Sequence, residues 1–147
     1  MILVPPPLYY AAGLAAGMAI DHVVTLPIGA RPATAIAGAL ITAAGAVLAA
    51  AGVVAVIRHR TTIVPHHAAR TLITAGPYRL SRNPMYTGLA VVYPGLTLLL
   101  GSWWPLALWP LAVLAVRWLV IRYEEDDLTG LFGEKYLDYR SRVRRWL

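Results

Sequence analysis

Long apolar stretches, broken only by short polar segments, dominate this chain. They run from about residue 8 to 27, from 33 to 57 and from 84 to 116, and the last contains no charged residue. About twenty consecutive apolar residues are enough for a helix to cross a bilayer. A helix that is apolar on every face must be buried, either in a protein core or in a membrane. The pattern therefore predicts an all-α fold, a polytopic membrane helical bundle.

The third apolar stretch is too long for one crossing, and the turn-forming segment from Gly101 to Pro105 divides it. We expect a hairpin of two spans there, with tryptophans at the bilayer interface. A charged, helix-patterned tail follows, and its arginine-rich end suits a helix lying on the anionic inner leaflet. The prediction is one domain over residues 1–147, with about four transmembrane helices, at about 8–27, 33–57, 84–100 and 105–121, plus a C-terminal interfacial helix.

The second predicted span carries a regular series of small residues. Gly38, Gly45 and Gly52 are seven residues apart, which places them on one face of a helix. Small residues on one face allow two helices to approach closely within a membrane. We expect this face to be a helix-packing surface.

The composition supports a membrane protein and excludes several other classes. The chain is 59% hydrophobic and 14% charged, whereas about 25% of the residues of a typical soluble domain are charged. It contains no cysteine, which excludes disulfides, thiolate metal sites and a cysteine nucleophile. The N-terminus lacks the basic region of a cleaved signal peptide, so we expect the first span to be retained.

The positive charges are distributed unevenly along the chain. Of the 13 Lys and Arg residues, all but Arg31 lie in the 58–82 segment or from residue 117 onward. Basic residues mark cytoplasmic segments, so we place these two segments and both termini in the cytoplasm. The Ala- and Arg-rich composition indicates a bacterial inner membrane. Because the net charge of +6 lies at the membrane edges, we expect contact with membrane lipids and not with nucleic acid.

The segment from residue 76 to 88, Gly-Pro-Tyr-Arg-Leu-Ser-Arg-Asn-Pro-Met-Tyr-Thr-Gly, is the candidate binding segment. Pro77 and Pro84 restrict the residues before them to extended shapes, so a compact turn should precede a helix that begins at Pro84. Such a turn exposes backbone N–H groups beside arginines, which suits an anionic or zwitterionic ligand. The alternative is a basic loop that only sets the membrane topology.

A closed hairpin brings the segments on its two sides to the same end of the bundle. Carboxylates there can bind an ammonium group, and arginines can bind a carboxylate through a forked contact. Tyrosine rings can hold an aromatic base or a sulfonium cation. The alternative is a helix face that is simply solvated at the interface. The residues expected to meet are Tyr78, Arg82, Asn83 and Tyr86 on one side, and Arg117, Arg122, Glu124 and Glu125 on the other.

The adjacent pair His66 and His67 raises the question of a metal site. Neighbouring side chains point apart unless the backbone bends, and no carboxylate lies close to them in the sequence. We therefore predict no metal site.

Several short motifs follow one another in the second half of the chain. They are Gly76-Pro77-Tyr78, Arg82-Asn83-Pro84-Met85-Tyr86, Glu124-Glu125, and Phe132-Gly133-Glu134-Lys135-Tyr136 with Tyr139. In this order and spacing, around a hairpin, they resemble the isoprenylcysteine carboxyl methyltransferase and phospholipid methyltransferase family over roughly residues 61–147. The resemblance implies an integral membrane methyltransferase that binds S-adenosylmethionine at the cytoplasmic edge, between segments 58–86 and 117–139.

The resemblance also implies roles for individual residues. Glu124 maps to the carboxylate that receives the methionine ammonium, and the main chain of residues 72–74 maps to further cofactor contacts. Arg70 and Asn83 stand where prenylcysteine enzymes often carry histidine, which leaves the methyl acceptor open. The implied cofactor-binding residues are Arg70, Leu72, Ile73, Thr74, Gly76, Tyr78, Arg82, Asn83, Pro84, Met85, Tyr86 and Glu124.

The methyl acceptor determines which catalytic groups are needed. In the prenylcysteine enzymes an arginine on the last span is tied to the acceptor, and Arg117 or Arg122 could serve here. An amine or phenol acceptor would instead need a base, for which His66, His67 and Glu125 are candidates. We take Arg117, Arg122, Glu125 and His66 as the candidate catalytic residues.

We therefore expect methyl transfer from S-adenosylmethionine to a small lipophilic acceptor, such as a lipid or an isoprenoid-like carboxylate, amine or hydroxyl, at the cytoplasmic face. The alternative is a non-catalytic small membrane transporter or scaffold of the same fold. A lipid reductase of similar architecture would need a nicotinamide site, and the chain has no Gly-rich dinucleotide fingerprint.

Overall fold

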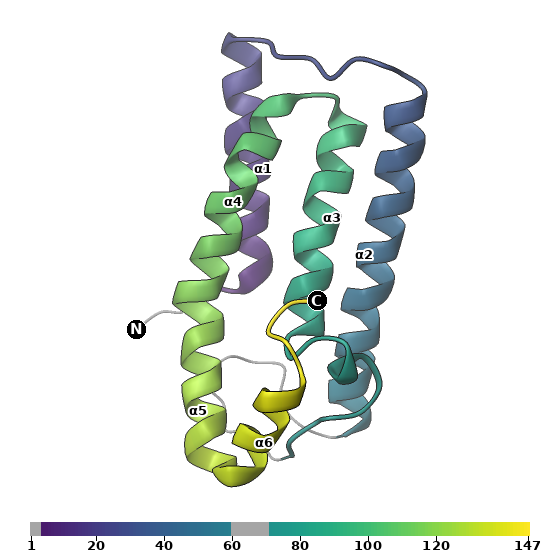
Figure 1. Ribbon diagram of the computed structural model, residues 1–147. Coiled ribbons are helices and arrows are strands. Elements are labelled where there is room, and N and C mark those ends of the chain that lie inside the picture. The colour runs from purple at the N-terminus through teal and green to yellow at the C-terminus, as the bar shows by residue number, and fades with distance from the viewer. Residues whose placement is uncertain (1–3, 60–70) are drawn as a thin grey trace.

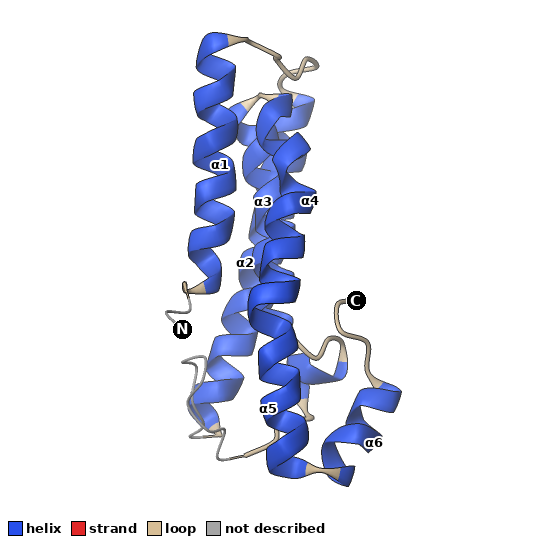
Figure 2. Ribbon diagram, turned by 90° about the vertical axis from the view of Figure 1, so that its left-hand side faces the viewer, coloured by secondary structure: helices blue, strands red, loops and turns tan. Residues whose placement is uncertain are grey.

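The computed structural model describes residues 4–59 and 71–147, which form a bundle of helices (Figures 1 and 2). The prediction of an all-α fold is confirmed over these residues. In chain order the elements are α1 (Pro6–Val23), α2 (Ala33–Arg58), the short 3-10 helix η1 (Gly76–Arg79), α3 (Pro84–Leu100), α4 (Trp103–Val116), the π-helix η2 (Arg117–Ile121), α5 (Arg122–Phe132) and α6 (Glu134–Arg142).

Two helices of the described chain are long and apolar enough to cross a membrane. One is α2, and the other is the continuous helix Trp103–Phe132 that α4, η2 and α5 form together. Helix α3 is apolar but shorter, with 17 residues. These helices support membrane association, and the predicted count of four spans stays a prediction.

The continuous helix is longer than a bilayer requires. Its 30 residues extend about 45 Å, whereas the hydrocarbon core is about 30 Å thick. Its apolar part ends at Ile121, and α5 carries four consecutive acidic residues from Glu124. Helices α5 and α6 also extend beyond the N-terminal end of α1 (Figures 1 and 2). We therefore treat α5 and α6 as lying outside the membrane-spanning part.

Helices α2 and α3 pack closely along the small-residue face predicted from the sequence. A Cβ atom added at Gly38 would lie 2.7 Å from the carbonyl oxygen of Gly95, and one at Gly45 would lie 2.7 Å from that of Gly88. Backbone atoms cannot move away from such a contact at low cost. Gly52 similarly faces Met85, at the start of α3. This packing fixes the end of α3 that carries the candidate site.

Helix α1 covers α4 on the other side of the bundle. A Cβ atom at Gly17 would lie 2.5 Å from the backbone of Pro105, so the two helices are in direct contact. Tyr10 meets Tyr93 edge to face, with ring centroids 6.2 Å apart, and the Tyr93 hydroxyl donates to the Pro105 carbonyl at 2.8 Å. These side chains belong to the main hydrophobic core.

The end of the bundle opposite the candidate site is closed by a small polar network. Gly101 ends α3 with a φ of +76°, a conformation that glycine adopts without a steric penalty. Ser102 then caps α4 and donates a hydrogen bond of 2.8 Å to Asp21 at the end of α1. Asp21 also accepts a bond of 3.0 Å from the Leu26 amide. Asp21 therefore has a structural role, because its side chain joins the loop after α1 to the α3–α4 hairpin.

Candidate functional site

The turn before α3 has a defined shape because its polar groups bind one another. The Asn83 amide donates to Ser81 Oγ at 3.1 Å, and Ser81 Oγ shares a hydrogen bond of 2.9 Å with Thr87 Oγ1. Pro84 occupies the first turn of α3, where its missing N–H group has no cost. The turn therefore fixes the direction of Tyr86, which lies in the first turn of the helix.

Tyr86 joins this turn to the start of α5. Its hydroxyl donates a hydrogen bond of 2.7 Å to Glu124 Oε1, and its side chain is buried. Tyr78 lies close enough to Glu124 to be influenced by its charge. Burial and the negative charge of Glu124 together raise the pKa of Tyr78 to about 12. The three residues form one cluster between the turn and α5, as expected of a closed hairpin.

Glu124 has an unusual environment for a carboxyl group. Burial raises its pKa to about 7, the charges of Asp127 and Glu125 act in the same direction, and the hydrogen bond from Tyr86 opposes them. Among residues 4–59 and 71–147, no arginine or lysine forms an ion pair with Glu124. A half-buried carboxyl group of this kind is suited to receive a cation from a ligand.

Glu125 is buried and lies between two arginines. Its side chain accepts from Arg145 Nε at 3.0 Å and pairs with Arg145 Nη2 at 2.5 Å, while Arg82 Nη2 lies 3.3 Å from Oε1. If one arginine is removed, the other still compensates the buried carboxylate, whereas loss of both would leave its charge without compensation. The pair Arg82 and Glu125 thus forms a second connection between the turn and α5, beside that of Tyr86 and Glu124.

Two tyrosines of α6 complete the wall of the cluster. The Tyr139 hydroxyl donates to the Tyr78 carbonyl at 2.6 Å, which ties η1 to α6. Tyr136 is buried against Arg82 and Glu125, and burial raises its pKa to about 12. Tyr136 and Tyr139 both belong to the sequence motifs described above. Whether their side chains point into the cluster depends on where α5 ends.

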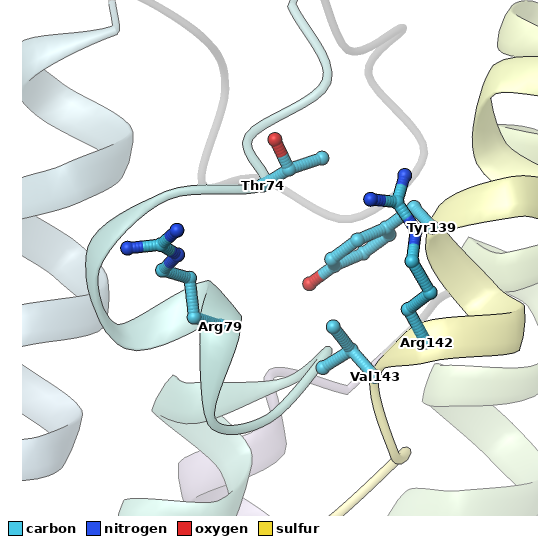
Figure 3. Close-up of a pocket in the computed structure, with 5 residues that line it drawn as sticks. All are labelled: Thr74, Arg79, Tyr139, Arg142 and Val143. Atoms are coloured by element: carbon cyan, nitrogen blue, oxygen red, sulfur yellow. The ribbon is translucent and has the colours of Figure 1, made fainter.

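A hollow of about 300 Å³ opens beside Tyr139. Figure 3 shows the Tyr139 hydroxyl pointing into it, with Arg79 and Arg142 on opposite walls. Its size matches the lower end of small-ligand pockets, and its lining is mixed polar, cationic and apolar. The residues around it are Thr74, Arg79, Tyr139, Arg142 and Val143.

The structure places the predicted site residues in four groups. Arg82, Asn83 and Tyr86, together with Tyr78, Glu124 and Glu125, come together as described, whereas Pro84 and Met85 begin α3 and Met85 packs against α2. Ile73 is buried, Leu72 is partly buried, Thr74 borders the hollow, and Gly76 begins η1 with a φ of +60°. His66, His67 and Arg70 lie outside the described residues.

The two predicted acceptor arginines lie on another face. Arg117 and Arg122 are exposed, and both guanidinium groups lie over the Trp118 ring, at 5.5 and 5.4 Å from its centroid. The structure does not bring them to the cluster around Glu124. Their proposed contact with the acceptor stays a prediction.

The π-helix η2 explains why the face of α5 is hard to predict. A π-turn inserts one extra residue into a helix, which rotates everything that follows by about 100° relative to an uninterrupted α-helix. In this chain the insertion lies at Arg117–Ile121, directly before the acidic residues. The one extra residue therefore determines which acidic side chains of α5 face the segment before α3.

These features define an all-helical, membrane-associated protein with a polar cluster at one end of its bundle. The sequence profile of the phospholipid methyltransferase family matches residues 33–135. This match covers well over half of the chain, and the chain therefore belongs to the phospholipid methyltransferase family, as the sequence motifs indicated.

Two curated relatives come from Arabidopsis thaliana. Protein-S-isoprenylcysteine O-methyltransferase B is 34% identical over 80 residues, and protein-S-isoprenylcysteine O-methyltransferase A is 36% identical over 80 residues. Each match covers 53% of this chain but only 38% of the relative, so this chain spans less than half of their length. No solved structure matches this chain.

Proposed function

We propose that this protein is a membrane methyltransferase that moves a methyl group from S-adenosylmethionine to a small lipophilic acceptor at the cytoplasmic face. The observation that carries the proposal is Glu124, a half-buried carboxyl group that Tyr86 orients and that no cation of the described chain neutralises. The ammonium of a methionine group would supply that cation. The residues present therefore fit this cofactor.

Two other predicted cofactor residues, Tyr86 and Tyr78, lie close to Glu124. Tyr78 and Tyr86 offer aromatic faces that suit a sulfonium cation, and Thr74 borders the hollow beside Tyr139. When bound, S-adenosylmethionine supplies an activated methyl group, so the cofactor carries the difficult chemistry. The task of the chain is to orient the acceptor and to exclude water.

The acceptor is proposed to be lipophilic and to reach the site from the bilayer. The family description and the names of the two relatives, which concern phospholipid and isoprenylcysteine, agree with this class. The carboxylate oxygens of Glu125 are already engaged by two guanidinium groups, so the side chain is not free to contact an acceptor. We therefore favour a carboxylate acceptor, which needs no base, over an amine or a hydroxyl.

Calorimetric titration of the detergent-purified protein with S-adenosylhomocysteine tests the cofactor. We expect wild type to bind, and Glu124→Ala to bind roughly ten- to a hundredfold more weakly, because a charged partner of the ligand is lost. Asp126→Ala is the matched control, since Asp126 is an exposed acidic residue on the same helix. A transporter or scaffold predicts no binding and no effect of either substitution.

Transfer of a tritiated methyl group from S-adenosylmethionine into a total lipid extract tests the reaction itself. We expect a labelled product in the organic phase with wild type and little with Glu124→Ala. Mass analysis of that product would identify the acceptor. Absence of any labelled lipid, with a protein that binds the cofactor, would argue against a lipophilic acceptor.

A further inference from the structure

The last five residues of the chain, Val143 to Leu147, lie against the turn before α3, and we call them the C-terminal strap. The Arg82 amide donates to the Arg144 carbonyl at 2.9 Å. The Arg145 carbonyl accepts from Ser81 Oγ at 3.1 Å and from Asn83 Nδ2 at 3.3 Å. The strap therefore binds the same turn that carries the proposed cofactor contacts.

The side chain of Arg145 reaches across the cluster to α5. Its guanidinium group makes a forked contact with both oxygens of Glu125, at 3.0 and 2.5 Å, and its side chain is one-quarter exposed. Forked arginine–carboxylate pairs fix the direction of both partners. Arg145 is thus positioned to hold Glu125 in one orientation.

This contact matters because α5 is otherwise weakly attached. Its main packing partners are its neighbours in the chain, η2 and α6. Its connections to the turn before α3 are polar, through Glu124 with Tyr86 and through Glu125 with Arg82. Holding Glu125 therefore also fixes the rotation of α5, and with it the direction of the adjacent Glu124.

We propose that Arg145 is a positioning residue for the cofactor site: by clamping Glu125 from the strap, it orients α5 so that Glu124 faces the ligand ammonium. The inference rests on the proposed function and deepens it. Arg145 lies beyond residue 135, where the match to the family profile ends.

A purely structural role for the strap has to be distinguished from positioning. Trp146 packs against the hydrophobic core, so loss of the strap could weaken the whole fold. A structural role predicts lower thermal stability with parallel changes in every kinetic constant. A positioning role predicts a specific loss of cofactor affinity, while the KM for the acceptor remains close to that of wild type.

The test compares full-length Arg145→Met, Arg145→Lys, Glu125→Gln and the double variant R145M/E125Q with wild type. The readouts are the Kd for S-adenosylhomocysteine, the KM for both substrates and the melting temperature. Arg140→Met is the control, because Arg140 is an exposed arginine of α6 for which no ion pair is found in the described chain.

We expect Arg145→Met to raise the Kd about tenfold or more, since a small displacement of a binding group can have effects of this size. Arg145→Lys should recover part of the affinity, because an ammonium group can contact one oxygen but cannot make the fork. The effect of R145M should largely disappear in the E125Q background, because Arg145 acts through Glu125.

An unchanged Kd in Arg145→Met, or effects of R145M and E125Q that simply add, would overturn the inference while leaving the proposed function intact. If Arg145→Met does not fold, Arg145→Lys provides the test. We expect its Kd to be at least threefold above that of wild type. A Kd equal to that of wild type would overturn the inference. A wild-type protein that does not bind S-adenosylhomocysteine would overturn the proposed function itself, and this inference with it.

Discussion

The hydroxyl of Tyr86 donates a 2.7 Å hydrogen bond to the carboxylate of Glu124, a residue 38 positions later in the chain. The two residues lie on opposite sides of the α3–α4 hairpin, so this bond exists only because the hairpin closes. It is also the contact that orients the one carboxyl group proposed to meet the cofactor ammonium. The strength of cofactor binding should therefore depend on it.

Replacing Tyr86 with phenylalanine removes this hydrogen bond and keeps the ring. A hydrogen bond to a charged group contributes about 1.5–3 kcal/mol, so we expect the Kd for S-adenosylhomocysteine to rise roughly tenfold or more. Calorimetric titration measures this change. Tyr9→Phe is the control, since Tyr9 packs against the same core. Equal affinities for Tyr86→Phe and wild type would show that the bond does not orient Glu124 for binding.

Cofactor affinity should depend on pH through Glu124. Its pKa is raised to about 7 in the folded chain, and only the ionised carboxylate attracts an ammonium group. Affinity should approach its full value about one unit above pH 7, and below pH 7 it should fall by up to roughly tenfold per pH unit. Titrations between pH 6 and 8 measure this dependence. In Glu124→Gln the dependence should flatten, and a slope that persists there would assign it to another group.

The same carboxyl group should affect stability in the opposite direction. Its folded pKa of about 7 lies above the ordinary value of 4.5. Between these values the folded chain keeps a proton that the unfolded chain has lost, so stability decreases as pH rises through this window. Without ligand, the melting temperature in detergent should therefore fall from pH 5 to 7.5, and Glu124→Gln should reduce that fall. A steeper fall in Glu124→Gln would contradict this linkage.

The hairpin and its polar cluster could be predicted because strong local signals determine them. The proline-containing turn fixes the start of α3, Gly101 and Ser102 fix the reversal, and together they bring Tyr86 close to Glu124. The small-residue face of α2 could also be predicted from the sequence, because glycines at seven-residue spacing lie on one side of a helix. These features depend on short-range rules of backbone geometry and on hydrophobic pattern.

Other parts of the site depend on long-range contacts that leave no local signal. Periodicity gives no location for a π-turn, so the direction of Arg117 and Arg122, over Trp118, could not be predicted. Arg145 is one of four arginines in the last eight residues, and nothing in the sequence distinguishes it. Its pairing with Glu125 follows from where α6 ends and the strap turns back.

Close packing of α2 against α3 should make Gly45 intolerant of larger residues. A Cβ atom there would lie 2.7 Å from backbone atoms of α3, and overpacking typically costs about 1–3 kcal/mol. We expect Gly45→Val to lower the melting temperature in detergent, together with cofactor affinity, because the start of α3 would shift. Ala46→Val, at an exposed position on the same helix, is the control. A Gly45→Val protein as stable as that control would contradict the close contact.

The proposed topology places the polar cluster in the cytoplasm and the loop between α1 and α2 on the other side of the membrane. The chain has no cysteine, so single introduced cysteines report their location without interference. Gly29→Cys is suitable for the loop, because nothing lies within 4 Å of an added Cβ atom, and Ser141→Cys is suitable for α6, where the serine is exposed. In intact bacterial cells an impermeant maleimide should label Gly29→Cys at once and Ser141→Cys only after permeabilisation. The reverse order of labelling would place the cluster outside the cell, where intracellular S-adenosylmethionine could not reach it. Labelling of both positions in intact cells would contradict a cytoplasmic site and the four-span arrangement alike.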